Sequence, residues 1–213
     1  MLELLIPSLM QTLDMVFFST LFSLVLGFPI GILLVITEKG SIWEKPTLYR
    51  LLDGIINILR SFPFLILMIL LFPLSRLIVG KTIGTTATIV PLSIAAAPFV
   101  ARVIESSLKE VDRGVIELGH SIGASVPQII FKILIPEAMP SLIMGVTLTV
   151  INLIGYSAMA GAIGGGGLGD LAIRYGLYRF QTDVMVAAVI IIVLLVQGIQ
   201  YAGNKLASKI SKK

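Results

Sequence analysis

The sequence contains no cysteine in its 213 residues, which excludes disulfide bonds and thiolate metal sites. It is also poor in charge, because charged residues make up 13% of the chain, against about 25% in a typical soluble domain. Hydrophobic residues make up 56%. A chain of this composition has too little polar surface to face water on all sides. We therefore identify it as an integral membrane protein of one domain, residues 1–213.

Several chemical groupings are missing as well. No Lys or Arg precedes Lys39, and the first apolar region is too long for the apolar core of a signal peptide, so we expect no cleavable signal. The only histidine, His120, stands apart from any acidic cluster with metal-ligand spacing, and no Ser-His-Asp set or pair of membrane carboxylates occurs. We expect neither a metal site nor catalysis by this chain. The basic residues behind the net charge of +4 are dispersed among apolar segments, which argues against a nucleic-acid partner.

Uncharged runs predict five membrane-spanning helices, since one crossing needs about 20 apolar residues. We place these spans at about residues 12–37, 56–77, 82–104, 138–163 and 184–206. The second is the weakest, because its uncharged core covers only residues 61–75. The uncharged run 138–169 is too long for one crossing, and Pro140 and the glycines from Gly161 onward indicate that the helix occupies only part of it. The sequence thus predicts an all-α membrane protein with its termini on opposite sides.

The distribution of Lys and Arg predicts the orientation, because cytoplasmic segments carry more of them. With the N-terminus outside, 12 of the 16 basic residues lie in inside segments, Arg60 among them. The four outside are Arg76, Lys81, Arg174 and Arg179. We therefore predict an external N-terminus, a cytoplasmic C-terminus and a cytoplasmic location for residues 112–136.

Residues 112–136, here called the cytoplasmic segment, have the pattern of two short helices. Asp112 can cap the first, and Gly123 suits the left-handed position after its end. Ser125 and Gln128 have the spacing of a capping box for the second, which is expected to stop at Pro136. Its apolar face consists of Ile129, Ile130, Ile133 and Leu134. On pattern alone, a knuckle gripped by another protein and an amphipathic connector on the lipid surface explain this segment equally well.

The spacing of Glu117, Gly123, Ile133 and Pro136 resembles the EAA loop of permease subunits in bacterial ATP-binding-cassette (ABC) importers. This chain has Glu-Leu-Gly where the family usually has Glu-Ala-Ala. In that family the loop is a coupling helix that docks in a cleft of a cytoplasmic ATPase subunit. The resemblance implies that Glu117, Gly123 and Ala124 make or permit this docking, and that Ile133 and Pro136 fix the return into the membrane.

The resemblance extends over nearly the whole chain. Arg60-Ser-Phe-Pro63 resembles a signature of the amino-acid branch of these permeases. Two stretches are similar to the permeases of methionine importers in particular. They are Ala97-Pro-Phe-Val-Ala-Arg102 followed by Glu105, and Gly155-Tyr-Ser-Ala-Met159 followed by glycines up to Gly169.

The resemblance implies the type I ABC importer permease fold, in the bacterial cytoplasmic membrane. Two copies would form a homodimer around a path for methionine, with the choice between the L and D forms left open. Two cytoplasmic ATPase subunits would bind ATP and Mg, and an extracytoplasmic methionine-binding lipoprotein would deliver the substrate. No cofactor is expected in this chain itself.

Alternative functions remain open at this point. A permease for another amino acid or small solute is the alternative within the family. An ATP-independent secondary carrier would require acidic residues in mid-membrane or inverted repeats, and the sequence shows neither. A membrane scaffold would explain the cytoplasmic segment but gives the polar and glycine-rich parts of the fourth span no purpose.

The fourth span carries candidates for the substrate path. Tyr156, Ser157 and Met159 lie near its outer end, and Asn152 lies deeper. A flexible Met side chain can pack against a thioether, and hydroxyl groups can bind a zwitterion. Ordinary helix packing is an equally good explanation, and Asn152 has the further alternative of a hydrogen bond between helices.

The glycines and two arginines are the remaining candidates. Gly164, Gly166 and Gly169 formally match a dinucleotide fingerprint, but no strand is expected before them. With Gly161 they are better explained as a close-packed, flexible end of the fourth span, or as a plain turn. Arg60 and Arg102 are expected to be structural or gating charges. Arg60 would pair with Asp53 or an acidic group on a neighbouring helix, and Arg102 with Glu105.

Overall fold

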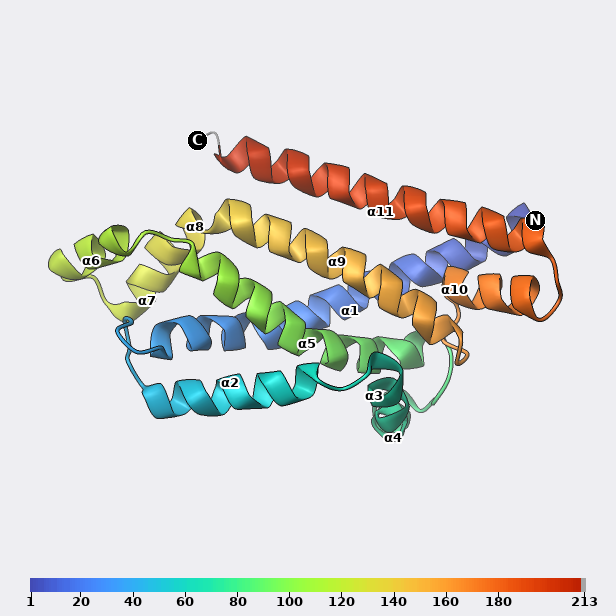
Figure 1. Ribbon diagram of the computed structural model, residues 1–213, viewed down its shortest axis with the longest axis horizontal. Helices are drawn as coiled ribbons and strands as arrows, with labels where there is room; N and C mark the ends of the chain where they lie inside the picture. Colours follow the sequence, from blue (N-terminus) through green and yellow to red (C-terminus); the bar gives the residue numbers. More distant parts are fainter. Residues whose placement is uncertain (212–213) are drawn as a thin grey trace.

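The computed structural model describes residues 1–211, and all regular structure in this range is helical (Figure 1). Four helices are long and apolar enough to cross a membrane. They are α1 (Leu2–Thr37), α5 (Thr85–Lys109), α9 (Met139–Gly161) and α11 (Thr182–Ser211). The first begins ten residues before the predicted start of its span, at Leu2, and the others lie close to the predicted ranges.

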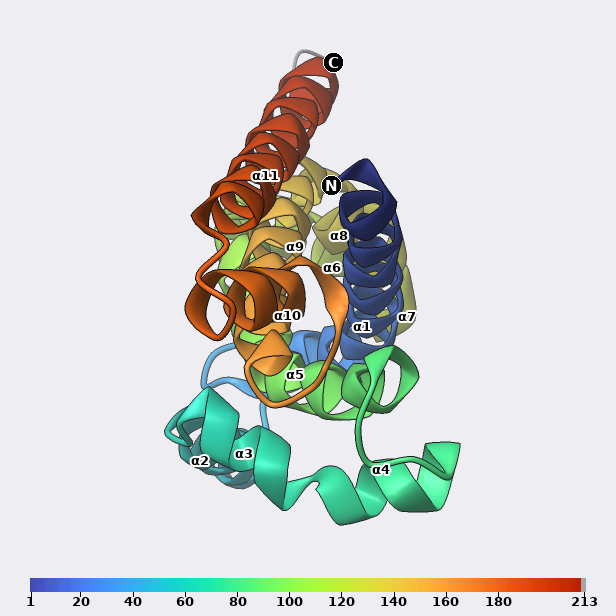
Figure 2. The same cartoon turned by 90° about the vertical axis from the view of Figure 1, so that its right-hand side faces the viewer.

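Helix α5 lies at the centre of the bundle. Figure 2 shows α2, α3 and α4 on one side and α11 on the opposite side, with α1, α5 and α9 between them. Two glycines of α1, Gly27 and Gly31, let α1 approach α5 closely. A Cβ at Gly31 would come within 2.6 Å of Ile104 Cβ, and one at Gly27 within 2.7 Å of Val100 Cβ. Small residues four apart on one helix face allow such close packing in membranes, and our sequence analysis did not use this pair.

The second predicted span is not one helix. It consists of α2 (Pro46–Arg60), α3 (Phe64–Leu70) and α4 (Phe72–Val79), and α3 turns away from α2 by 99°. Pro63, which cannot continue a helix and disfavours helical geometry in the preceding residue, lies at the turn. If this bent pair counts as one crossing, the described residues contain five candidate spans.

The break predicted at Pro136 lies slightly later in the chain. Helices α7 (Val126–Ile129) and α8 (Ile135–Glu137) are joined by a π-helical stretch, η1 (Ile130–Leu134), so the helix passes Pro136 and ends at Glu137, before the turn at Ala138 that precedes α9. The amide of Ile135 donates to the carbonyl of Ile130, five residues earlier. The wider π-helical turn is suited to a proline, because it gives the ring room beside the carbonyl groups of the preceding turn.

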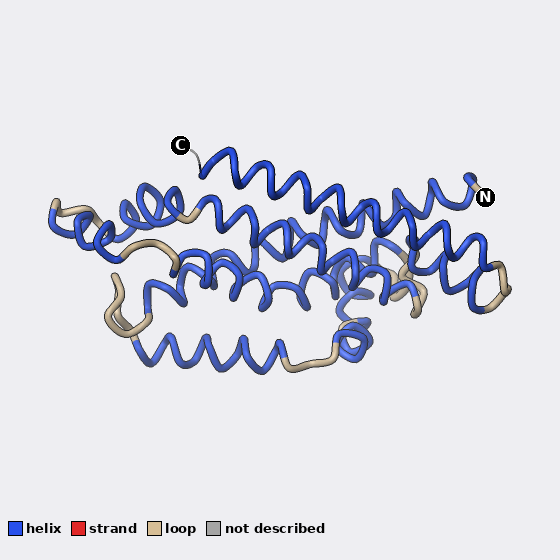
Figure 3. Tube along the Cα trace, turned by 45° about the horizontal axis from the view of Figure 1, so that its top comes forward, coloured by secondary structure: helices blue, strands red, loops and turns tan. Residues whose placement is uncertain are grey.

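The N-terminus and the C-terminal end of α11 lie at opposite ends of the bundle (Figures 1 and 3). The N-terminus lies with α10 (Gly167–Leu171) and the π-helix η2 (Ala172–Leu177), whereas the C-terminal end of α11 lies with α6 (Arg113–Ser121) and α7. The cytoplasmic segment and the C-terminal end of α11 thus share one end of the bundle, in agreement with their predicted placement on one side. Lys212 and Lys213, which the charge count includes, lie outside the described residues. Which end faces the cytoplasm stays a prediction.

Candidate functional site

Helix α6 of the cytoplasmic segment is closed at both ends by local hydrogen bonds. The carboxylate of Asp112 accepts from the amide of Gly114 at 2.7 Å. At the other end Gly123 adopts φ = +77°, and its amide donates to the carbonyl of His120 at 2.9 Å. The amide of Ala124 donates to the carbonyl of Gly119 at 3.0 Å. These two bonds form a Schellman motif, so the predicted helix end at Gly123 is confirmed.

The second part of the segment packs against the first. The amide of Ser125 donates to the side chain of Gln128 at 2.8 Å, as expected for a capping box. Ile129 is fully buried, and Ile133 reaches so close to Gly119 that a Cβ there would lie 2.7 Å from Ile133 Cδ1. Gly119, which stands where the family usually has Ala, is therefore buried against Ile133, and a Cβ there would require the end of the Ile133 side chain to move. The sequence analysis did not single out Gly119, although the departure from Glu-Ala-Ala was a signal.

The outer face of α6 carries apolar side chains in the open. Val115, Leu118 and Ile122 are 36%, 63% and 75% exposed, and they recur at helical spacing on one face. Glu117 and His120 are also exposed, and they line a cleft of about 510 Å³ between α6 and the connection that follows α1. Glu38, Lys109 and Arg113 contribute charges to the same cleft.

The inner face of the cytoplasmic segment joins the membrane core. Leu134 and Ala138 are buried in a cluster with Val35 of α1 and Ile104 of α5, and Ile116 of α6 packs against it. Helix α6 and η1 are therefore packed against the core that α1, α5 and α9 share.

The four candidate residues of the fourth span do not converge on one site. Tyr156 stacks on Phe64 of α3, with ring centroids 4.5 Å apart, and lines a small cavity beside α5. The buried hydroxyl of Ser157 donates to the carbonyl of Ile154 at 2.8 Å within α9. Met159 is exposed, and Asn152 is half-buried. A part in the substrate path stays a prediction for all four.

The glycines after α9 are tightly packed. A methyl group on Gly161 would overlap the backbone of Asp170, and one on Gly169 would overlap the backbone of Ala158. Gly164 and Gly166 have φ values of +84° and +81°. These glycines do not form a dinucleotide-binding fingerprint, because the helix α9 precedes them and the fingerprint requires a strand there.

This glycine loop is held to the N-terminal part of the chain. The amide of Gly167 donates to the side chain of Gln11 at 2.9 Å, and the amide of Leu168 donates to the hydroxyl of Thr12 at 2.9 Å. Our sequence analysis did not single out Gln11 or Thr12, because nothing in their local pattern indicates a partner 156 residues away. The flexibility expected for Gly161, Gly164, Gly166 and Gly169 stays a prediction.

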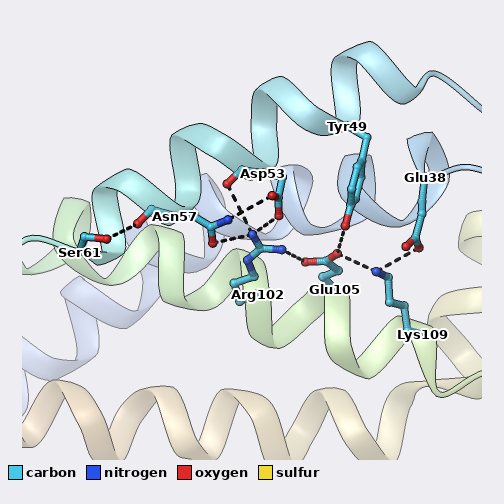
Figure 4. A network of polar contacts seen from close by, with 8 residues as sticks. All are labelled: Glu38, Tyr49, Asp53, Asn57, Ser61, Arg102, Glu105 and Lys109. Carbon is cyan, nitrogen blue, oxygen red and sulfur yellow. Dashed lines mark hydrogen bonds and ion pairs between the residues drawn. The ribbon is translucent and has the colours of Figure 1, made fainter.

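Arg102 lies at the centre of a polar network between α2 and α5 (Figure 4). Its guanidinium pairs with Glu105 at 2.7 Å, as predicted. It also pairs with Asp53 and donates to Asn57 at 2.9 Å. The expected pairing of Arg60 with Asp53 is therefore wrong, because Arg102 occupies that carboxylate.

The network continues along α5 toward the cytoplasmic segment. Lys109 pairs with Glu105 at 2.9 Å and with Glu38, at the end of α1, at 3.0 Å. Glu105 is only 4% exposed and also faces the hydroxyl of Tyr49 at 3.5 Å. The ends of α1, α2 and α5 are thus joined through charged groups (Figure 4).

Comparisons with known proteins give a consistent result. A family model described as "binding-protein-dependent transport system inner membrane component" matches residues 27–202. The chain is 47% identical over 211 residues to the probable D-methionine transport system permease protein MetI of Vibrio cholerae serotype O1, covering 99% of this chain and 94% of that protein. It is 46% identical over 181 residues to the methionine import system permease protein MetP of Bacillus subtilis, covering 85% and 82%.

A solved structure matches as well. It is a crystal structure of the MetNI methionine ABC transporter in an inward-facing conformation. The match has a TM-score of 0.97 at 44% sequence identity and covers 99% of this chain and 97% of that chain.

Proposed function

Because the chain belongs to the family of binding-protein-dependent transport system inner membrane components, we propose that it is the permease subunit of an ABC importer for methionine. It spans the cytoplasmic membrane and forms the path, and a partner subunit hydrolyses ATP with Mg. The permease is not itself an enzyme. Two copies form the path together, and a methionine-binding lipoprotein delivers the substrate from outside.

The exposed apolar face of α6 is the observation that supports a role in coupling to the ATPase. An apolar face exposed to water marks a docking surface for a partner, and an amphipathic helix commonly lays such a face in a groove. Leu118 and Ile122 are the most exposed members, and Glu117 is an exposed residue of the same helix on the side that lines the cleft. We assign this face, with Glu117, to the contact with the ATPase.

The inner face of the same segment supports a mechanical role. Leu134, Ala138 and Ile116 belong to the cluster that includes residues of α1, α5 and α9. When ATP binding draws the two ATPase subunits together, each α6 moves with its partner, and the core helices must follow. ATP thereby favours one packing of the two permease copies over the other, and hydrolysis resets it.

Transport by the reconstituted complex tests this proposal. The permease, its ATPase and its binding protein are assembled in liposomes, and ATP-dependent methionine uptake is compared for the native chain, Glu117→Lys and Glu137→Lys. Glu137 is an exposed acidic residue of α8 at the same end of the molecule, so Glu137→Lys is matched for the charge change.

We expect Glu117→Lys to lower uptake by about tenfold or more, since a misplaced charge at an interface costs several kcal/mol and about 1.4 kcal/mol is a factor of ten. Glu137→Lys should transport normally. An ATPase that co-purifies with every variant, with uptake lost only in Glu117→Lys, supports coupling through α6. If the intact native complex hydrolyses ATP without transporting methionine, the proposal that methionine is the substrate is refuted. If the chain does not co-purify with an ATPase, the proposal that it is an ABC permease is refuted.

A further inference from the structure

Arg60 is the last residue of α2, directly before the 99° turn into α3. Its side chain lines a small cavity of about 160 Å³ together with Phe62, Phe64, Phe99 and Tyr156. Pockets for drug-sized ligands measure about 300–1,000 Å³. This cavity therefore suits a ligand no larger than a single amino acid.

The cavity lies at the middle of the membrane helices, so Arg60, which the charge count placed in an inside segment, lies at membrane depth. Ala95 and Phe99 of α5 line it, and each is ten residues from the nearer end of that helix. At the helical rise each residue is about 15 Å from the nearer end of α5. Figure 1 likewise shows the turn between α2 and α3 beside the body of α5, away from both ends of the bundle.

Among residues 1–211 of a single copy, the exposed side chain of Arg60 has no counter-ion. It takes part in none of the ion pairs or side-chain hydrogen bonds of these residues. The acidic residue on its own helix, Asp53, is occupied by Arg102 and by the amide of Asn57 at 3.1 Å. A charged residue at membrane depth is costly unless it is paired or faces a water-filled path, so it marks a functional site.

The remaining lining residues are aromatic or aliphatic, and the Tyr156 hydroxyl is the one polar side-chain group among them. The Tyr156 ring is held by its stack on Phe64. Its hydroxyl forms no hydrogen bond to any of the residues that the structure describes. A few convergent polar groups among apolar side chains are typical of small-molecule sites. The guanidinium selects a carboxylate, preferably in a bidentate contact, and aromatic rings pack favourably against a thioether.

We propose that this cavity is a substrate site on the transport path, in which Arg60 binds the α-carboxylate of the transported amino acid. The Tyr156 hydroxyl faces the polar head of this amino acid, and Phe62 and Phe99 contact the side chain of the amino acid. The inference rests on the proposed function, because it takes the substrate to be an amino acid. It gives a role to the unpaired charge of Arg60, which the packing of the chain does not explain.

Protection from alkylation tests binding at the cavity directly. The chain has no cysteine, so a single one at Leu59, a partly exposed residue of the lining, reports on this site alone. Leu51→Cys, 61% exposed on the same helix and away from this cavity, is the matched control. The permease–ATPase complex without nucleotide is treated with a maleimide, and labelling of this chain is followed with and without methionine.

We expect methionine at ten times its dissociation constant to slow labelling of Leu59→Cys about tenfold, since about 9% of the sites then remain free. Labelling of Leu51→Cys should not change. Methioninol, which keeps the thioether and the amine but lacks the carboxylate, should not protect Leu59→Cys. Adding Arg60→Gln should abolish the protection by methionine. Equal protection by methioninol, or protection that survives Arg60→Gln, would overturn the proposal.

Uptake by the reconstituted complex provides a second readout. Arg60→Gln should lower uptake about 10- to 100-fold, the value of one charge-assisted hydrogen-bonded contact, while ATP hydrolysis stimulated by the loaded binding protein continues. Arg60→Lys should keep part of the uptake, because it retains the charge without the bidentate geometry. Arg50→Gln, an exposed arginine of the same helix, should transport normally.

The outcomes separate the two proposals. Native uptake of methionine with neither protection at Leu59→Cys nor an effect of Arg60→Gln refutes this site and leaves the proposed function intact. Protection by a different amino acid, combined with no methionine uptake, refutes methionine as the substrate and supports the carboxylate site.

Discussion

Glu105 is the residue at which the ends of three helices meet through polar atoms. Its carboxylate is almost completely buried and accepts from Arg102 and Lys109. Those cations in turn bind Asp53 of α2 and Glu38 at the end of α1. The two positive groups compensate the buried negative charge, so the cluster is stable only as a set.

We expect Glu105→Gln to destabilise the protein by about 2–3 kcal/mol, since both cations lose a charged partner inside the bundle. Glu38→Gln should cost less than about 1 kcal/mol, because the Glu38–Lys109 pair is more than one-third exposed on both sides. Unfolding of the purified permease by SDS in mixed micelles measures both values. A loss for Glu105→Gln no larger than that for Glu38→Gln would show that the network does not stabilise the bundle.

At the scale of the element, the glycine loop is held by the close approach of two backbone segments. A methyl group on Gly169 would overlap the carbonyl oxygen and Cα of Ala158, which are backbone atoms of α9. A flexible side chain could move aside, but a helix backbone cannot do so without shifting the whole element. The site therefore accepts only glycine.

We expect Gly169→Ala to destabilise the protein by about 3 kcal/mol, the upper range for overpacking in a core. Gly155→Ala is the control on α9, where no atom lies within 4 Å of the added Cβ. It should be neutral or stabilising by up to about 1 kcal/mol, because Ala is the better helix former. The yield of folded, monodisperse permease and its thermal unfolding in detergent distinguish the two. Equal stability of the two variants would contradict the close packing.

The sequence predicts helix ends well where the signal is local. Gly123, Asp112 and the Ser125–Gln128 pair act through hydrogen bonds to neighbouring residues, and the structure places them as expected. Pro136 marks the break less accurately, because the π-helical stretch before it accommodates the ring and the helix continues to Glu137. A breaker residue predicts a disturbance and does not say how the chain absorbs it.

Partners that are distant in sequence are less predictable. Arg102 was expected to pair with Glu105, three residues away, but its second carboxylate comes from Asp53 on another helix. Gln11 and Thr12 likewise bind a loop 156 residues further on. Such contacts depend on how the helices pack, and a single sequence without an alignment carries no record of that packing.

At the scale of the whole molecule, the chain has two distinct ends. One carries α6, α7 and the C-terminal part of α11, and the other carries the glycine loop, η2 and the N-terminus (Figure 1). The residues proposed for ATPase contact and the cavity beside Arg60 belong to separate parts of the bundle, and α5 runs between them. The distribution of Lys and Arg assigns α6 to the cytoplasm, and this assignment can be tested without any partner.

Cysteines introduced at the two ends report the orientation, because the native chain has none to react. Ser121 is an exposed residue of α6, and Leu177, 61% exposed, ends η2. In intact cells a membrane-impermeant maleimide should label Leu177→Cys and leave Ser121→Cys unmodified, while permeabilised cells should show both labelled. The expectation follows from the excess of Lys and Arg beside α6, which holds that end on the cytoplasmic side. Labelling of Ser121→Cys alone in intact cells would reverse the orientation, and α6 would then be out of reach of a cytoplasmic ATPase.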